Sequence, residues 1–217
     1  GREVDEEELK LWELEIKKKG IKIEKEEEIG IKLPTPTKIE ARFASPVLKN
    51  GVILYKNVIL GVSKEYDVSE SLIKAIITQE SMWDKVAKEP INNPKSYGLM
   101  QVTEGASKDV DLYKEFLNDE FKPTTNIEIG TAYYAHLRKT YYEDTNSGED
   151  LKKITLAAYN CGLGNIAKIC QDNLWDSCTK KGFDEHCSKN DVPQYISNIL
   201  AYEKEFNKEE FPKERFK

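Results

Sequence analysis

The sequence lacks the features that mark several large classes of protein. No apolar run approaches the roughly 18 residues that a membrane-spanning helix needs. Lys and Arg number 33 against 39 Asp and Glu, so the formal net charge of -6 leaves no basic excess to neutralise nucleic-acid phosphates. The metalloprotease motif HExxH, the nucleophile motif GxSxG and the Walker phosphate loop are all missing. These absences argue against a membrane-spanning protein, a nucleic-acid-binding protein and the enzymes that those motifs mark.

Histidine is also scarce, since only His136 and His186 are present. His136 falls inside an expected helix with no Cys or Ser at a spacing that suggests a catalytic pair, and His186 is expected to be exposed. The glycines of Gly162-Leu-Gly164 follow a helix instead of a strand, so they do not predict a dinucleotide site. We therefore expect no cofactor and no metal ion.

Four cysteines lie close together in the chain, at Cys161, Cys170, Cys178 and Cys187. None forms a C-x-x-C pair, which argues against structural zinc. An even, closely grouped number fits two disulfides in an oxidising compartment, with four buried free thiols as the alternative. If residues 161–170 form one continuous helix, Cys161 and Cys170 lie about 13 Å apart and cannot pair. The remaining pairings stay open.

The chain divides near residue 50. Residues 1–20 predict a charged helix, and in residues 21–45 the prolines Pro34 and Pro36 block helix, so we expect extended segments that form a small hairpin or an arm on the main domain. From residue 51 onward the apolar residues recur at helical spacing. We predict a mainly α-helical domain at 51–217 behind a small N-terminal extension at 1–50. The expected helices cover 52–65, 68–82 (with a capping box of Asp67 and Glu70), 104–118, 126–142, 147–162 and 192–208, with a loop at 83–103.

A carboxyl group lies on the apolar face of one expected helix. Ile73, Ile77 and Glu80 are spaced i, i+4 and i+7, so they share the face that should point inward. Burial disfavours the charged form of a carboxyl and raises its pKa. Such a group suits a general acid that later acts as a base near neutral pH. The structural alternative is a glutamate that caps or pairs with a buried polar group.

Five segments around Glu80 resemble, in order and spacing, the motifs of the soluble lytic transglycosylases. These are goose-lysozyme-like catalytic domains that cut peptidoglycan. The resemblance covers residues 50–207 and implies a lysozyme-like (goose-type) α-helical fold. The segments are TQES at 78–81, SYGLMQV at 96–102, NIEIGTAYYAHL at 126–137, LAAYNCGLGNI at 156–166 and VPQYISNIL at 192–200.

The resemblance implies a role for individual residues. Glu80 is the single catalytic acid/base, and Ser81 helps to hold the substrate or intermediate. Tyr159 and Asn160 are expected to face the glutamate, and Tyr195 to lie on the far side of the glycan groove, although either tyrosine would also suit a plain core position. The turn that lines the groove comprises Ser96, Gly98, Leu99, Met100 and Gln101, where Met100 would add an apolar contact and Gln101 amide hydrogen bonds.

The sequence also departs from the family pattern. Cys161 replaces the alanine that usually follows the Tyr-Asn pair, and a disulfide there would hold the segment of Tyr159 and Asn160 in place. The cysteine-rich stretch at 167–190 is longer than the simple pattern, as an insertion would be.

The implied reaction is cleavage of the β-1,4 bond between N-acetylmuramic acid and N-acetylglucosamine. Glu80 would protonate the glycosidic oxygen and then take the proton of the C6 hydroxyl, which closes a 1,6-anhydro ring without water or metal. A hydrolytic goose-type lysozyme is the nearest alternative and would need a second carboxylate, for which Asp84 and Asp109 are candidates. A non-catalytic glycan-binding or scaffold domain of a secretion apparatus is another. A wall-opening factor for secretion, conjugation or a phage tail would use the same chemistry.

The resemblance and the cysteines also imply a setting. We expect a monomer that binds peptidoglycan strands in the cell envelope, either periplasmic or extracellular. Residues 1–50 or the cysteine-rich stretch would offer a docking surface to envelope machinery. No signal peptide is visible, because Gly1-Arg2-Glu3 opens a charged segment, and a start without Met is compatible with removal of an export signal.

Overall fold

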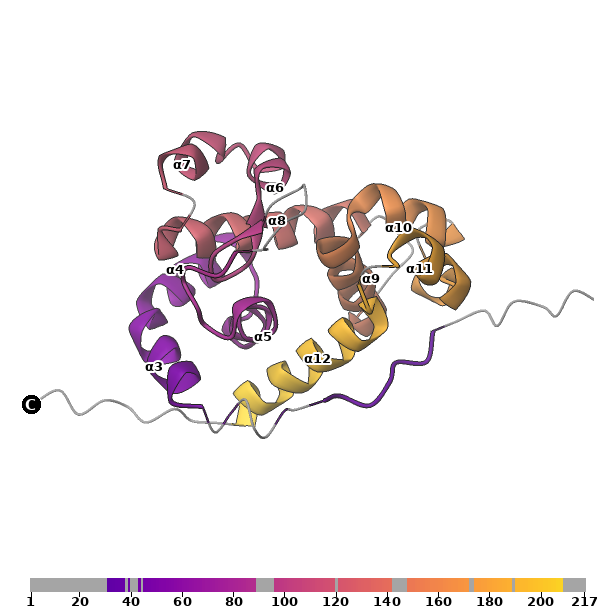
Figure 1. Cartoon of the computed structure of the whole chain (residues 1–217), viewed down its shortest axis with the longest axis horizontal. Helices are drawn as coiled ribbons and strands as arrows, with labels where there is room; N and C mark the ends of the chain where they lie inside the picture. The colour runs from indigo at the N-terminus through magenta and orange to yellow at the C-terminus, as the bar shows by residue number, and fades with distance from the viewer. Residues whose placement is uncertain are drawn as a thin grey trace, which may run out of the picture.

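The computed structural model describes residues 31–37, 39, 43, 45–88, 96–119, 121–141, 148–171, 174–188 and 190–208. The helix expected at 1–20 lies outside these residues, as does the first part of the extended segment. Helices dominate the described part (Figure 1), so the expected mainly α-helical fold is confirmed. The helices are α3 (Pro46–Leu54), α4 (Lys56–Tyr66), α5 (Glu70–Ser81), α6 (Glu104–Asp109), α7 (Tyr113–Asn118), α8 (Pro123–Tyr141), α9 (Gly148–Cys161), α10 (Leu163–Ile169), α11 (Lys180–His186) and α12 (Val192–Lys208), with a short 3-10 helix η2 (Trp175–Ser177).

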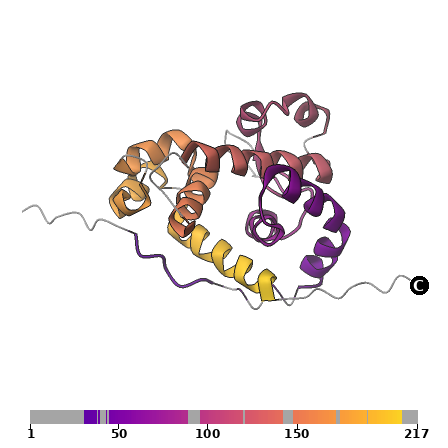
Figure 2. The same cartoon turned by 180° about the vertical axis from the view of Figure 1, so that it is seen from behind.

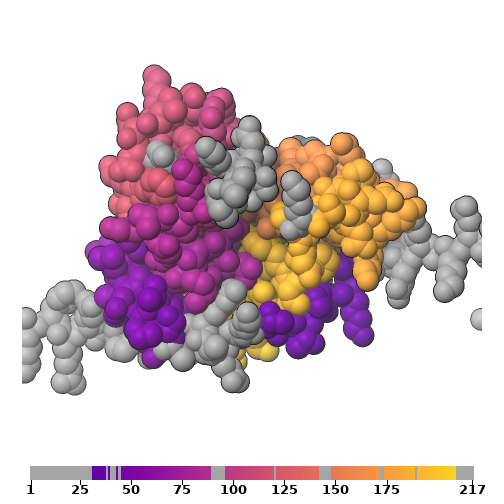
Figure 3. Space-filling view, viewed as in Figure 1, coloured from indigo at the N-terminus to yellow at the C-terminus, as the bar shows by residue number. Residues whose placement is uncertain are grey.

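Helix α5 occupies the middle of the fold. It packs along α12 and against α4, while α8 crosses the molecule and packs on α4 and α9 (Figures 1 and 2). On one face of the molecule the magenta region that includes α5 lies beside the yellow region of α12 (Figure 3). The inward side chains of α5, including Ile73, Ile76 and Ile77, are completely buried. This packing fixes the end of α5, where Glu80 lies.

Three helix boundaries differ from the sequence expectation. The helix expected at 52–65 is two helices, α3 and α4, that meet at Tyr55. Asp67 adopts a left-handed conformation with φ 53° and ends α4, so it does not begin the next helix. Ser69 caps α5 instead, because its hydroxyl accepts a hydrogen bond from the Leu72 amide at 3.3 Å. The helix expected at 104–118 is divided into α6 and α7, between which Asp111 is left-handed with φ 61°.

The expected loop at 83–103 contains a small hairpin within its described part. Strands β1 (Ser96–Tyr97) and β2 (Val102–Thr103) pair in antiparallel register, and residues 98–101 form the turn between them. The short helix α10 leads into the cysteine-rich stretch and α11 lies within it, and the sequence analysis predicted neither helix. Each covers only seven residues, too few for helical periodicity to stand out.

Residues 31–37 form an extended arm along α12, as Figure 1 shows in indigo. The Thr37 amide donates to Asn198 Oδ1 at 2.9 Å, and Gln194 Nε2 donates to the Thr35 carbonyl at 3.0 Å. The expectation of an arm on the main domain therefore holds for these residues, because α12 supplies the partners that an extended backbone lacks.

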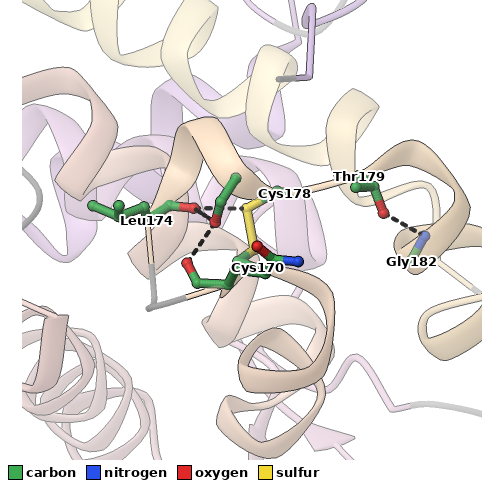
Figure 4. Close-up of a disulfide and its surroundings, with 7 residues drawn as sticks. Cys170, Leu174, Cys178, Thr179 and Gly182 are labelled. Atoms are coloured by element: carbon green, nitrogen blue, oxygen red, sulfur yellow. Dashed lines mark hydrogen bonds between the residues drawn. A yellow bond between two sulfur atoms is a disulfide. The ribbon is translucent and has the colours of Figure 1, made fainter. Parts of the chain in front are cut away.

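Both expected disulfides are present, so the alternative of four free thiols is wrong. Cys161 pairs with Cys187, and Cys170 pairs with Cys178. Helix α9 ends at Cys161, and Gly162 has φ 91°, so the continuous helix considered for residues 161–170 does not exist. The excluded pairing is nevertheless absent. Figure 4 shows Cys170–Cys178 closing a short loop in which the Leu174 carbonyl faces Cys178.

None of the helices in the described part of the chain has both the length and the hydropathy that crossing a membrane requires.

Candidate active site

Glu80 lies in the last turn of α5 with its side chain only partly exposed. Burial raises the pKa of the Glu80 carboxyl from 4.5 to about 7, and a hydrogen bond from Tyr195 opposes that rise. Near neutral pH the group therefore exchanges readily between its acid and carboxylate forms. This is the behaviour that the apolar face of the helix predicted, and it suits proton transfer in both directions.

Trp83 fixes the end of the helix that carries Glu80. Met82 and Trp83 are both left-handed, with φ 52° and 67°, and they turn the chain sharply back onto the core. The buried Trp83 donates from Nε1 to Thr78 Oγ1 at 2.9 Å. Its ring lies against Gly51 of α3, where a Cβ atom would come within 2.6 Å of a ring carbon. Glycine at position 51 therefore allows the close packing that holds this end of α5.

Tyr195, on the first turns of α12, contacts Glu80 directly. Its hydroxyl donates to Glu80 Oε1 at 2.5 Å. Burial, followed by the neighbouring Glu80, raises the pKa of Tyr195 well above 10, so the phenol remains a hydrogen-bond donor. Tyr195 is thus the direct hydrogen-bond partner of the carboxyl, a contact that the sequence analysis did not predict.

Tyr159, on α9, lies within electrostatic range of Glu80. Burial raises the pKa of Tyr159 well above 10, and Glu80 and Tyr133 add to the effect. The Tyr159 hydroxyl donates to the Met100 carbonyl at 2.9 Å, so the hydroxyl proton points to the turn between β1 and β2 and not to Glu80. The ring of Tyr133 from α8 lies 5.7 Å from the Tyr159 ring, a neighbour that the sequence analysis did not single out.

The turn itself is built on Gly98 and Asn126. Gly98 has φ 71°, and a Cβ atom there would lie 2.5 Å from Asn126 Nδ2, so both conformation and space require glycine. The buried Asn126 donates to the Tyr97 carbonyl at 2.7 Å and accepts from the Met100 amide at 2.8 Å. Sequence analysis missed this organising role, although an asparagine at the start of an apolar helix face is a signal of a buried polar contact.

Two carbonyls of this turn anchor the residues beside Glu80. Ser81 Oγ donates to the Leu99 carbonyl at 2.8 Å, and Tyr159 donates to the Met100 carbonyl. The side chains of Leu99 and Met100 are completely buried. The apolar contact expected of Met100 is therefore with the core and not with a ligand.

Gln101 and Ser96 hold the turn from the other side. Gln101 has φ 47°, and its Nε2 donates to the Gly98 carbonyl at 2.8 Å and to the Ala87 carbonyl at 3.2 Å. Ser96 Oγ donates to Gln101 Oε1 at 2.7 Å. The amide bonds that were expected to reach a glycan are thus made within the turn.

Asn160 presents an acceptor that the fold leaves free. Its carbonyl oxygen accepts from Asn190 Nδ2 at 3.1 Å, whereas its side-chain Oδ1 is buried and has no hydrogen-bond partner among the described residues. Because buried polar atoms are normally paired, this oxygen is suited to accept a hydrogen bond from a ligand.

Neither candidate for a second carboxylate lies at the site. Asp84 is exposed and its Oδ1 accepts from the Val86 amide at 3.0 Å. Asp109 is exposed at the end of α6, where it raises the pKa of Tyr133 and not that of Glu80. Within the described residues, no carboxylate contributes to the pKa of Glu80, and no group of three or more His, Cys, Asp or Glu could hold a metal ion.

Known proteins named lytic murein transglycosylases are similar to this chain over more than half of its length. Membrane-bound lytic murein transglycosylase E of Buchnera aphidicola is 28% identical over 156 residues, which are 66% of this chain and 68% of that protein. Membrane-bound lytic murein transglycosylase C of Salmonella typhi is 33% identical over 124 residues, covering 53% of this chain and 33% of that protein. The chain thus spans about a third of the length of the C-type relative.

Solved structures share the fold over most of the described residues. A 70-kDa soluble lytic transglycosylase in complex with bulgecin A aligns with a TM-score of 0.53 and 25% identity over 73% of this chain and 25% of that one. An inactive mutant of the lytic transglycosylase Slt from Pseudomonas aeruginosa aligns with a TM-score of 0.51 and 21% identity over 70% of this chain and 24% of that one. The lysozyme-like fold class is confirmed by these alignments.

The family comparison covers the residues of α4 through η2, including Glu80, the hairpin turn and Tyr159. The family model described as "Transglycosylase SLT domain" matches residues 57–177, more than half of the 217-residue chain. This protein therefore belongs to the transglycosylase SLT domain family.

Proposed function

We propose that this protein is a peptidoglycan lytic transglycosylase in which Glu80 is the only acid/base group. The observation that carries the proposal is the carboxyl of Glu80, whose pKa is raised to about 7 and whose direct partner is the phenol of Tyr195. The relatives named lytic murein transglycosylases support peptidoglycan as the substrate.

The reaction begins with Glu80 in its acid form, which burial favours. Its proton passes to the glycosidic oxygen as the bond from that oxygen to C1 of N-acetylmuramic acid breaks. The N-acetyl group of the same sugar stabilises the positive charge at C1. The leaving N-acetylglucosamine keeps the transferred proton as a hydroxyl, and Glu80 becomes a carboxylate that the Tyr195 hydroxyl stabilises.

The second step returns the proton to Glu80. The carboxylate takes the proton of the C6 hydroxyl as O6 forms a bond to C1, which closes the 1,6-anhydro ring. No water is consumed and no second carboxylate is needed. A hydrolytic lysozyme would use a carboxyl partner about 5–10 Å away to activate water or to act as nucleophile. The exposed positions of Asp84 and Asp109 favour the transglycosylase over this alternative.

Ser81 and Asn160 supply acceptors for the glycan. Because the Ser81 hydroxyl donates its proton to the Leu99 carbonyl, its lone pairs remain available to a sugar hydroxyl or acetamido N–H. Asn160 Oδ1 offers a second acceptor that no described residue occupies. Both groups are oriented by the hairpin turn and by α9, so they would position the sugar beside Glu80.

The decisive experiment is mass spectrometry of purified peptidoglycan digested with the wild-type protein and with Glu80→Gln. Muropeptides lighter by one water, with anhydro ends, are expected from the wild type. Glu80→Gln should lower their release by about 100-fold to 10,000-fold, since it removes the acid/base group. Products with reducing ends would identify a lysozyme instead. Glycan binding without cleavage by the wild type would identify a binding module.

We place this activity in the cell envelope, as the names of the membrane-bound relatives and the two disulfides suggest. In this proposal residues 51–217 form the catalytic domain, and residues 1–50 form an extension available to envelope partners. The proposed working unit is a monomer. Size-exclusion chromatography with light scattering tests the monomer directly.

A further inference from the structure

One of the two disulfides joins the chain segments that carry both tyrosines beside Glu80. Cys161 is the last residue of α9, two positions after Tyr159. Cys187 ends α11, where its amide donates to the Phe183 carbonyl. The bond between these cysteines brings their Cα atoms to 5.8 Å. It therefore ties the end of α9 to the chain that leads into α12.

Hydrogen bonds continue from this disulfide to Tyr195. The Asn190 amide donates to the Cys187 carbonyl at 2.8 Å, and the Val192 amide donates to the Asn190 carbonyl at 3.0 Å. The Tyr195 amide then donates to the Asp191 carbonyl at 2.9 Å, in the first turn of α12. The position of Tyr195 is thus connected to Cys187 through a short run of bonded backbone.

A second link reinforces the same junction. Asn190 Nδ2 donates to the carbonyl of Asn160 at 3.1 Å, one residue before Cys161. The junction is needed because α9 has no helical continuation: Gly162, with φ 91°, turns the chain away immediately after the cysteine. Without cross-links, the end of α9 and the start of α12 would be held here only by packing.

The other disulfide provides an internal contrast. Cys170 and Cys178 are only eight positions apart and join the end of α10 to the residue after η2. The residues bonded around them, including Leu174 and Ser177, belong to the same local loop (Figure 4). The side-chain hydrogen bonds of Ser177 and Cys178 are made within this loop, while η2 as a whole packs against α9.

We propose that the Cys161–Cys187 disulfide is a positioning element of the active site, which holds Tyr159 and Tyr195 in register around Glu80. This inference rests on the proposed catalytic role of Glu80. Full turnover then requires this disulfide to be oxidised, whereas it does not require Cys170–Cys178. A chain in a reducing environment has the catalytic glutamate but lacks the cross-link that fixes its partners.

The pKa of Glu80 depends on the position of Tyr195, so it can be used to measure this positioning role. The groups that face Glu80 are Tyr195 from α12 and Tyr159 from α9, and both remain neutral near pH 7 because their pKa values are raised well above 10. The Tyr195 bond lowers the pKa of Glu80, so lengthening that bond while the carboxyl stays buried raises the pKa. A purely structural disulfide would leave this titration unchanged.

The test compares Cys161→Ala/Cys187→Ala with the matched control Cys170→Ala/Cys178→Ala. Anhydro-muropeptide release gives kcat and its pH dependence, and carbon-13 NMR of the Glu80 carboxyl, assigned with Glu80→Gln, gives its pKa without substrate. We expect the first pair to lower kcat by about 10-fold to 100-fold, since small displacements at a site carry such losses. Its Glu80 pKa and the alkaline limb of its pH profile should move to higher pH. The control pair should match the wild type in both respects.

Equal kcat and equal Glu80 pKa in the two double variants would overturn the proposal. So would equal changes in both, which would indicate a general loss of structure. If the wild type releases no anhydro product, the proposed function fails, while the NMR comparison still tests the positioning role.

Two further experiments test the proposal if Cys161→Ala/Cys187→Ala folds poorly. Asn190→Ala keeps the disulfide and removes only the bond to Asn160, so it should move the Glu80 pKa in the same direction by less. Dithiothreitol should lower the activity of Cys170→Ala/Cys178→Ala, in which Cys161–Cys187 is the remaining cross-link. No response to the reductant, with that bond shown by mass spectrometry to be reduced, would contradict the proposal.

Discussion

Two opposing influences set the proton affinity of Glu80 at the scale of single residues. Burial favours the neutral acid, and the Tyr195 hydroxyl favours the carboxylate. A carboxyl with a much higher pKa would donate its proton poorly to the glycosidic oxygen, and one with a much lower pKa would be a weak base toward the C6 hydroxyl. The balance near pH 7 allows one group to serve in both steps of the proposed reaction.

The raised pKa of Glu80 predicts a pH-dependent cost in stability. Below pH 4.5 the carboxyl is protonated in the folded and unfolded states alike, so burial carries no ionic cost. Between pH 4.5 and about 7 the unfolded state ionises while the folded state keeps its proton, so stability falls through this range. The full difference from 4.5 to about 7, which is reached above pH 7, corresponds to about 3 kcal/mol. Glu80→Gln should therefore be more stable than the wild type at pH 8 and gain much less at pH 4. Calorimetry across this range checks the prediction, and a difference independent of pH would contradict it.

Tyr195→Phe tests the hydroxyl that contacts Glu80. Removing a donor that favours the carboxylate should raise the pKa of Glu80 and move the alkaline limb of kcat/KM to higher pH. Turnover should fall by about tenfold, because the lost bond is worth about 1.5–3 kcal/mol to a charged partner and only part of it acts in the transition state. Steady-state rates from pH 4 to 9 measure both effects.

Tyr141→Phe is the matched control for that variant. Tyr141 is also buried, and its hydroxyl makes no hydrogen bond to any residue that the structure describes. Its replacement should leave the rate and the pH profile unchanged. A shift of the pH limb in the control, or none in Tyr195→Phe, would contradict the assigned role of the Tyr195 hydroxyl.

At the scale of elements, the hairpin turn links the core to the site. Its residues donate or accept bonds to Ser81 of α5, Asn126 of α8 and Tyr159 of α9. A small change in the turn therefore acts on three helices at once. This explains why the sequence motif contains Leu99 and Met100, whose buried side chains anchor the turn in the core.

Gly98→Ala tests the turn. Alanine disfavours the left-handed φ of 71°, and its methyl group would lie only 2.5 Å from Asn126 Nδ2. We therefore expect a loss of about 2–4 kcal/mol in unfolding free energy with reduced activity. Gly61→Ala is the control, since position 61 lies inside α4 with no atom within 4 Å of an added Cβ. It should stabilise by about 0.5–1 kcal/mol. Chemical denaturation measures both changes, and equal effects at the two positions would refute the steric argument.

Sequence periodicity predicted the long helices well and the short elements poorly. The apolar spacing of Ile73, Ile77 and Glu80 identifies the candidate acid from the sequence, and the structure gives it the expected raised pKa. The failures are local. Asp67 and Ser69 are both good caps, and only the left-handed backbone at Asp67 decides that Ser69 begins α5.

The sequence predicted where the candidate site lies but not which hydrogen bonds its residues make. A pattern identifies Tyr159 and Tyr195, but which of them donates to Glu80 depends on how α9 and α12 pack against α5. The amide of Gln101 was expected to face a ligand and instead bonds within the turn. Tertiary geometry chooses among partners that the sequence leaves equivalent, which is also why the disulfide pairing stayed open.

At the scale of the whole molecule, the N-terminal arm supports the helix that carries Tyr195. Besides the bonds at Thr35 and Thr37, Ser197 Oγ donates to the Pro34 carbonyl at 2.5 Å. Farther along the chain, the ring of Phe43 lies 4.7 Å from that of Phe206. The arm thus contacts α12 along much of its length, on residues other than those that face Glu80.

A pair of truncations measures what the arm contributes. A chain that begins at Ile31 serves as the reference, and one that begins at Ser45 lacks the arm and Phe43. Three hydrogen bonds at about 0.5–1.5 kcal/mol net each set an expected loss of about 2–4 kcal/mol in unfolding free energy. Because the bonds hold α12, the shorter chain should also show faster amide exchange in α12 than in α8.

The distribution of that exchange decides between two roles for the arm. Faster exchange confined to α12, with a Glu80 pKa moved upward, would mean that the arm stabilises the active site through Tyr195. A uniform increase across α5, α8 and α12 would mean that it adds only global stability. Unchanged stability and exchange in the shorter chain would show that the contacts of residues 31–37 and Phe43 contribute nothing measurable, and that packing against α5 and α9 suffices to hold α12.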